Sequence, residues 1–249
     1  MSYMNLDRSG FQVTGEYQLS TQMFEGYKSE IQSKSDGTRV AVAKADGIEY
    51  VLDVDWLRAA SKTYQVSDNI KDFVFVEVPG LTIDIPNRNM DEFGYDVVTE
   101  FSPRSGRFVF RTFVGKPTCK DHNNKDVTKA VGINFDSFLV PWSNGYYKIK
   151  TLSGFDRSKD SILANEILTK KRIGYSMGAL VGESRCSICN AVSCVPAHKQ
   201  CIHFRNYGKG KLFQGKLIYD RCRYVEFIEM SSVLDPADVT AVENKRVWE

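Results

Sequence analysis

In Ala130-Val-Gly-Ile-Asn-Phe-Asp-Ser-Phe-Leu-Val140, apolar and polar residues alternate loosely, as they do in a half-buried strand. Three residues later comes Ser143-Asn-Gly145, and Asn-Gly is a strong signal for the turn of a β-hairpin. In residues 146–152, aromatic and β-branched side chains alternate with lysines. These two runs predict a β-hairpin at the centre of the chain.

Further strand signals lie on both sides of this hairpin. They fall at residues 73–78, 108–114, 173–180, 216–220 and 224–233, and a second hairpin is expected from residues 40–43 and 50–54 around the turn at 44–47. Helix signals are fewer: residues 54–62, residues 158–171 with Ser158 or Asp156 as the cap, and a final turn or short helix that starts at Pro236. We therefore expect a β-rich α+β fold, a closed or nearly closed β-barrel surrounded by helices.

The composition and charge of the chain indicate a globular protein and argue against a nucleic-acid-binding or membrane-spanning one. The 249 residues are 42% hydrophobic, enough for one large domain or two small ones, and the net charge is only +2. This balance makes nucleic acid an unexpected partner for the chain as a whole. No apolar run reaches the roughly 18 residues of a membrane span, and residues 1–10 have no signal-peptide core. A cytosolic location without membrane attachment is expected.

Of three histidines, only His122 stands apart from the cysteines. It lies in a polar loop that also contains Asp121 and Asp126, and loops on a rigid scaffold commonly carry catalytic groups. Taken alone, such a histidine is more often solvated than catalytic. A second candidate is Ser176 in Gly174-Tyr-Ser-Met-Gly178, where a glycine would let backbone amides approach an oxyanion. The helix-before-strand order excludes the α/β-hydrolase elbow.

The cysteines point to a metal. Four of the six fall within sixteen residues, and in a reducing cytosol such a cluster indicates metal ligation. Cys186 and Cys189 form a CxxC pair, and Cys201 and His203 supply two further ligands for a tetrahedral zinc site. Three cysteines and one histidine fill a tetrahedral site and leave no open position for catalysis, so the zinc is expected to be structural. Spare donors, Cys194 and His198, leave the fourth ligand open.

Taken in order, four segments resemble the prohead (capsid maturation) serine proteases of tailed phages, which are similar to the herpesvirus assemblins. They cover residues 79–242: Leu81-Thr-Ile-Asp-Ile-Pro-Asn-Arg-Asn89, the loop from Gly115 to Asp126, Tyr175-Ser-Met-Gly178, and the closing segment 227–238. No single motif is specific, but the ordered set is harder to obtain by chance. The resemblance implies an assemblin-like barrel with a small zinc-binding insertion at residues 184–206.

The same resemblance implies a mechanism. His122 would take the proton of Ser176, which attacks a peptide carbonyl and forms an acyl-enzyme. The related phage proteases are thought to use a carboxylate as the third member. Glu229 is our choice because a charge in the apolar run 227–230 needs a partner, while Asp126 and Asp121 remain rivals.

The resemblance also implies domains, partners and a place of action. Residues 79–249 would form the protease domain, and residues 1–78 an N-terminal extension of uncertain role that is partly β. The expected substrates are the phage major capsid protein, scaffold and core proteins and the chain itself, with self-association, in the host cytoplasm inside the assembling prohead. The competing hypothesis is a zinc-ribbon binding module or structural head-core protein without proteolytic activity, favoured by the basic residues Arg205, Lys209, Lys211 and Lys216.

Overall fold

A computed structural model describes residues 11–14, 30–33, 39–45 and 48–242 of the chain. Asp46 and Gly47, half of the turn expected at 44–47, lie outside these ranges, as does the polar segment 1–10. Within the described ranges, no helix combines the length and the apolar character needed to cross a membrane.

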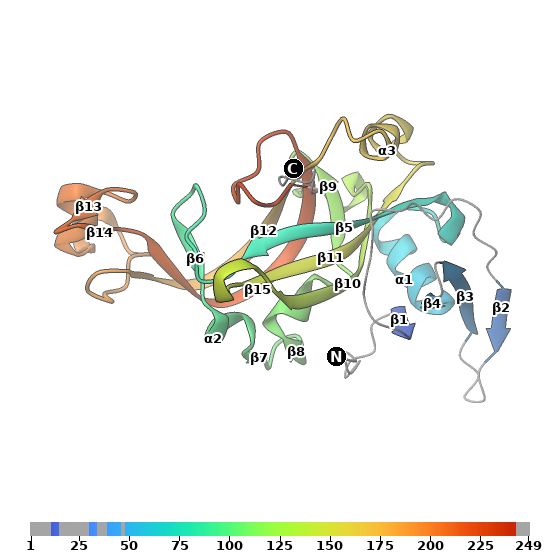
Figure 1. Cartoon of the computed structure of the whole chain (residues 1–249), viewed down its shortest axis with the longest axis horizontal. Helices are drawn as coiled ribbons and strands as arrows, with labels where there is room; N and C mark the ends of the chain where they lie inside the picture. Colours follow the sequence, from blue (N-terminus) through green and yellow to red (C-terminus); the bar gives the residue numbers. More distant parts are fainter. Residues whose placement is uncertain (1–10, 15–29, 34–38, 46–47, 243–249) are drawn as a thin grey trace.

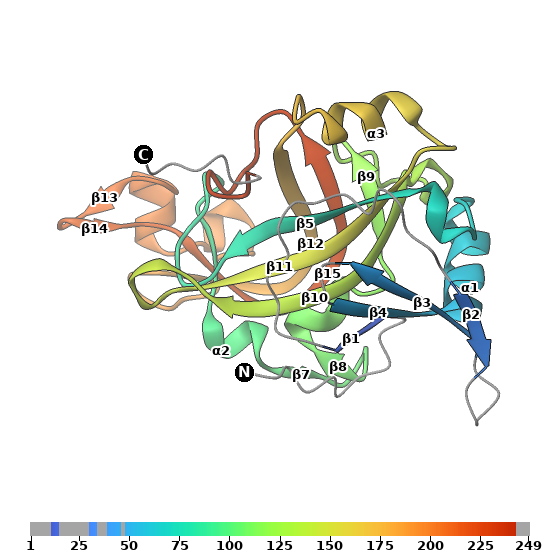
Figure 2. The same ribbon diagram turned by 45° about the vertical axis from the view of Figure 1, so that its right-hand side comes forward.

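The fold is mixed α+β and β-rich, and its main sheet is curled into a half-barrel (Figures 1 and 2). The sheet runs in the order β12-β15-β9-β10-β11-β5, with β6 paired to β15, and only β15 with β9 and with β6 are parallel pairs. Its end strands β12 and β5 contact each other, but among the described residues no ladder closes the barrel. The strands are β5 Phe73–Thr82, β6 Asp91–Phe93, β9 Pro117–Lys120, β10 Gly132–Pro141, β11 Tyr147–Asp156, β12 Gly174–Cys186 and β15 Asp220–Val233.

Both predicted hairpins are confirmed. β10 and β11 are antiparallel with Pro141 opposite Tyr147, and Asn144 and Gly145 in the connection both take left-handed backbone angles. The N-terminal hairpin is β3 Arg39–Ala45 with β4 Ile48–Asp53, flanked by β2 Glu30–Ser33 and β1 Phe11–Thr14 in a second sheet.

The predicted helix after this sheet is also confirmed, as α1 Val54–Tyr64. Its buried Leu57 joins a second core cluster with Ile133 and Phe135 of β10, so the helix packs directly against the main sheet. The boundary expected at residue 78 falls inside β5, because that strand already begins at Phe73.

The strand expected at residues 108–114 was wrong. Only Arg107–Phe108 is extended, as β8 paired with β7 Phe101–Ser102, and Val109–Phe113 forms a 3-10 helix. Its buried residues are Val109, Thr112 and Phe113, a three-four spacing that belongs to a helical turn rather than to a strand. Phe113 stacks on Phe227 of β15 at 4.2 Å between ring centroids.

Two helix predictions need correction. The helix expected at 158–171 is shorter, α3 Ser161–Leu168, and its cap is Asp160, which accepts a hydrogen bond from the Leu163 amide. Asp156 instead binds the backbone of Ser158 in the preceding turn. No helix starts at Pro236, because Asp238 accepts the Thr82 amide of β5 at 2.6 Å and so ties this segment down in an irregular form. A further short helix is α2 Tyr95–Val98.

The cysteine-rich segment projects from the half-barrel. β12 and β15 remain paired from Gly174 opposite Val233 to Cys186 opposite Asp220, forming a long two-stranded ribbon. At its far end lie the cysteine cluster and a small hairpin, β13 Leu212–Phe213 with β14 Lys216–Leu217 (Figures 1 and 2). Residues 187–219 lie beyond the last pair of the ribbon, and they contain most of the insertion expected at residues 184–206, of which 184–186 belong to β12.

Candidate functional site

Three neighbouring strands bring the candidate catalytic residues together. Ser176 lies in β12 opposite Ser231 of β15, and Glu229 lies in β15 opposite Gly178. β9, on the other side of β15, ends at Lys120, and His122 follows in the turn. Although the three residues are far apart in sequence, strand order β12-β15-β9 places them side by side.

Glu229 contacts His122 directly. Its Oε1 lies 2.8 Å from the imidazole Nδ1, and its Oε2 accepts a hydrogen bond of 2.6 Å from the Ser231 hydroxyl. Glu229 is completely buried, whereas the His122 side chain is 44% exposed. The hydrogen bond and the negative charge of Glu229 raise the pKa of His122 above 6.5 against the opposing effect of partial burial, and Asp121 adds to the rise.

A β-bulge sets the direction in which Glu229 points. Gly178 pairs with Glu229 but Ala179 pairs with Phe227, so Ile228 is an extra residue in β15. Phe227 and Met230 both enter the main hydrophobic core, which a regular strand would not allow for residues three apart. Glu229, next to Met230, therefore points to the face opposite the main core, toward His122.

His122 is held in an uncommon backbone conformation. Both Asp121 and His122 have left-handed φ angles, 51° and 56°, which non-glycine residues adopt rarely. The buried Arg172 forms an ion pair with Asp121, and the Ser231 hydroxyl accepts the backbone N–H of His122 at 3.2 Å. These contacts fix the turn and so orient the imidazole.

The two rival carboxylates have other partners. Asp126 is exposed and accepts hydrogen bonds from the amide and hydroxyl of Thr128, where it caps a 3-10 helix at Val127–Lys129. Asp121 is engaged by Arg172. Glu229 is thus the carboxylate that the structure places in hydrogen-bond contact with His122.

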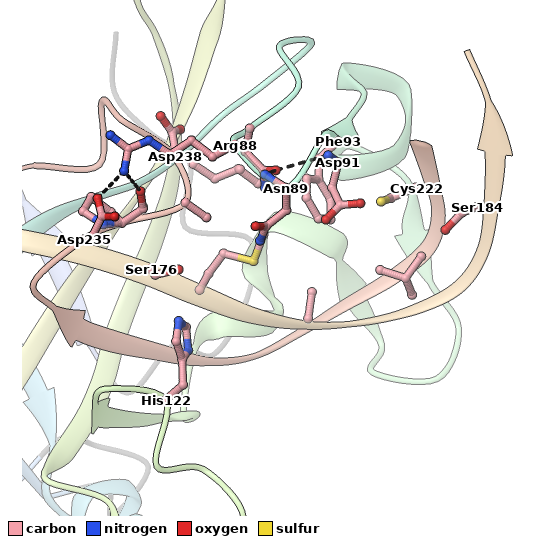
Figure 3. A pocket seen from close by; sticks show the side chains of 18 residues that line it. Arg88, Asn89, Asp91, Phe93, His122, Ser176, Ser184, Cys222, Asp235 and Asp238 are labelled. Carbon is pink, nitrogen blue, oxygen red and sulfur yellow. Dashed lines mark hydrogen bonds and ion pairs between the residues drawn. The ribbon is translucent and has the colours of Figure 1, made fainter. Parts of the chain in front are cut away.

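Ser176 and His122 line the same cavity of about 610 Å³. Figure 3 shows the imidazole pointing toward Ser176 across the ribbon. No hydrogen bond joins these two described residues, and catalytic hydrogen bonds often tighten only when substrate is bound. On the far side of the cavity, Arg88 forms an ion pair with Asp235 and so ties the 84–90 loop to the 234–238 segment (Figure 3).

The second cluster, at the end of the ribbon, could hold a metal ion. The ligand atoms of Cys186, Cys189, Cys201 and His203 all lie within 4.8 Å of one another, and Cys186 Sγ is 3.8 Å from His203 Nδ1. Cys186 and His203 are buried. Three thiols and one imidazole converging in this way suit a tetrahedral metal site.

The two spare donors lie elsewhere. Cys194 accepts the backbone N–H of Ser184 at 3.4 Å, and His198 belongs to an exposed 3-10 turn at Ala197–Lys199. Neither belongs to the four-residue cluster.

Three residues that support the site, Ser231, Arg172 and Gly178, were not identified as such from sequence. Ser231 bridges Glu229 and the His122 backbone, and its position two residues after Glu229 on one strand face was the available signal. The sequence predicts that Gly178 lets backbone amides approach an oxyanion. In the structure a Cβ at Gly178 would come within 2.6 Å of Glu229 Oε1, so this glycine makes room for the carboxylate.

No family of known proteins, no curated protein and no solved structure matches the chain.

Proposed function

We propose that the chain is a serine endopeptidase in which Ser176 is the nucleophile, His122 the general base and Glu229 the residue that orients His122. The observation that carries this proposal is the fully buried Glu229 carboxylate, 2.8 Å from His122 Nδ1, beside a cavity that Ser176 also lines. A nucleophile, a base and a group that orients the base form the general arrangement for acyl transfer.

The chemistry follows from the hydrogen bonds. When Nδ1 of His122 donates to Glu229, Nε2 is left free to accept the Ser176 proton. The Ser176 oxygen then bonds to the substrate carbonyl, the leaving amine takes the proton from His122, and water hydrolyses the acyl-enzyme by the same route. Burial of Glu229 strengthens its interaction with the imidazolium that forms in each step.

For the biological role we propose cleavage of scaffold and capsid proteins during phage prohead maturation, on an assemblin-like scaffold. What supports it is the order of the four segments that resemble those proteases. For the metal we propose zinc, because three cysteines and one histidine form a ligand set that zinc favours and that leaves no open position.

The test is proteolysis by purified protein. Incubated with a peptide library derived from a bacterial proteome, wild type should produce new cleavage products, and Ser176→Ala should produce none while keeping the same circular dichroism spectrum. Cleavage by the alanine variant at the wild-type rate would remove Ser176 from the mechanism. Absence of cleavage by both proteins would favour the alternative, a binding or structural protein whose basic insertion contacts a partner.

A further inference from the structure

The insertion at the end of the ribbon carries an unusual charge. Residues 186–219 contain five lysines and arginines and no aspartate or glutamate. The whole chain has 33 basic and 31 acidic residues, so the remainder of the chain has three more acidic than basic residues. A positive excess confined to one projecting segment favours binding to a negatively charged partner there.

Most of these charged side chains have no partner among the residues that the structure describes. Lys209 is the exception: it binds Asp91 of β6 and Asp220 of β15, and so ties the insertion to the ribbon. The side chains of the other four are exposed and form no hydrogen bond or ion pair with the residues that the structure describes; they are Lys199, Arg205, Lys211 and Lys216.

Exposed apolar side chains lie among these cations. Leu212 is 63% exposed, Ile202 51% and Tyr207 47%. The small hairpin brings cationic and aromatic residues together, since Phe213 of β13 pairs with Lys216 of β14. The ring of Phe213 also contacts the ring of Tyr207, with 5.2 Å between the ring centroids. Because Phe213 pairs with Lys216 and Leu212 pairs with Leu217, Lys216 and Leu212 lie on opposite faces of the hairpin. We call Tyr207, Lys211, Leu212 and Lys216, which together flank both faces of the hairpin, the hairpin patch.

The composition of the hairpin patch distinguishes between two kinds of polyanion. Nucleic acid would exploit the lysines and the Tyr207 ring, but would leave the highly exposed Leu212 without an apolar partner. An acidic polypeptide segment that also carries apolar residues and crosses the end of the hairpin satisfies both the lysines and Leu212 on the opposite face. The second partner therefore fits better.

The position of the patch suggests why it would be useful. Ser176 and Cys186 are ten residues apart on β12, about 30 Å of extended strand, so the insertion is remote from Ser176. The cavity extends along the ribbon toward the insertion, because Ser184 and Cys222 also line it. We propose that the hairpin patch docks acidic, partly apolar segments of polypeptide substrates while another part of the same substrate enters the cavity. The role in docking substrates for cleavage rests on the proposed endopeptidase function. The binding of acidic, partly apolar segments does not depend on it.

The binding test uses the full chain purified with zinc and fluorescence anisotropy. The probe is a labelled 20-residue amphipathic peptide with glutamates on one helix face and leucines on the other. Lys211→Glu combined with Lys216→Glu should weaken binding on the order of tenfold, and added salt should weaken wild-type binding, since exposed charges are screened. Leu212→Ser should weaken binding severalfold.

The matched control is Lys62→Glu combined with Lys171→Glu, two exposed lysines outside the insertion, which should leave binding unchanged. Equal loss in this control, or unchanged binding in the Lys211/Lys216 variant, would overturn the proposal. So would tighter binding of a 20-nucleotide oligo-dT than of the peptide, which would assign the patch to nucleic acid.

Cleavage activity is measured in a separate experiment. The Lys211/Lys216 variant should cleave short peptides as wild type does and cleave a substrate fused to the acidic segment more slowly. Ser176→Ala should bind the probe normally. An inert Ser176 with normal probe binding would reject the endopeptidase alone, and normal cleavage without probe binding would reject the docking patch alone.

Discussion

At the scale of single residues, Glu229 determines how His122 can act. The carboxylate is buried, and both of its oxygens have partners, His122 and Ser231. A buried carboxylate in contact with a catalytic histidine stabilises the imidazolium and fixes the tautomer. Its removal should therefore affect both the rate and the pH dependence of the reaction.

Glu229→Gln should lower turnover by about four orders of magnitude, the cost of losing an orienting carboxylate in a serine protease. The base must be neutral to accept the Ser176 proton, so kcat/KM of wild type should rise with pH through the raised pKa of His122, above 6.5. In Glu229→Gln this rise should move to lower pH, because the negative charge is gone. A pH profile of both proteins measures the shift.

Asp126→Asn is the control, since Asp126 is exposed and caps a neighbouring turn. It should keep wild-type turnover and pH profile. A strongly impaired Asp126→Asn next to an active Glu229→Gln would transfer the orienting role to Asp126.

Gly178 provides an independent test of the position of the carboxylate. A Cβ there would lie 2.6 Å from Glu229 Oε1, so Gly178→Ala should displace the carboxylate from His122 and lower kcat by about tenfold or more. The matched change is Gly182→Ala on the same strand, where the nearest atom is Tyr224 Cβ at 3.0 Å, away from the site. Steady-state kinetics should show a loss only for Gly178→Ala; equal activities would contradict the steric argument.

At the scale of elements, the ribbon β12–β15 links the two clusters, with Ser176 and Glu229 near one end and Cys186 near the other. The insertion has few buried apolar residues, and small domains of this kind usually need a metal to fold. We therefore expect the metal to stabilise the fold of the insertion, and the half-barrel to stay folded without it.

Elemental analysis should find one zinc per chain. Cys201→Ser should lose it and become sensitive to proteolysis within residues 187–219, while Cys194→Ser, outside the cluster, should retain it. Equal metal loss in the two variants would show that the ligand set is different.

The elements also show what sequence can and cannot predict here. Alternation and Asn-Gly predicted the β10–β11 hairpin correctly, because both signals are local. The run at 108–114 looked like a strand because it is aromatic and β-branched, yet stacking of Phe113 on Phe227 favours a 3-10 turn, and that contact is long-range. The bulge at Ile228, which sets the direction of Glu229, likewise depends on pairing with Gly178 across the sheet.

At the scale of the whole molecule, a curled sheet places three distant segments on adjacent strands. The sequence pointed to Ser176, His122 and Glu229 individually, and the cysteine spacing predicted the donor set of the metal cluster. The supporting contacts from Ser231 and Arg172 and the space at Gly178 could not be foreseen, because each depends on strand register or on the path of a turn.

Covalent labelling with a fluorophosphonate, followed by intact-mass and peptide analysis, measures directly whether His122 and Glu229 activate Ser176. Such a reagent reacts with a serine only when a base activates it. Our prediction is one label per chain, on Ser176, formed much more slowly in His122→Ala and Glu229→Gln and at the wild-type rate in Asp126→Asn. An unlabelled wild type, or labelling that persists in Ser176→Ala, would contradict it.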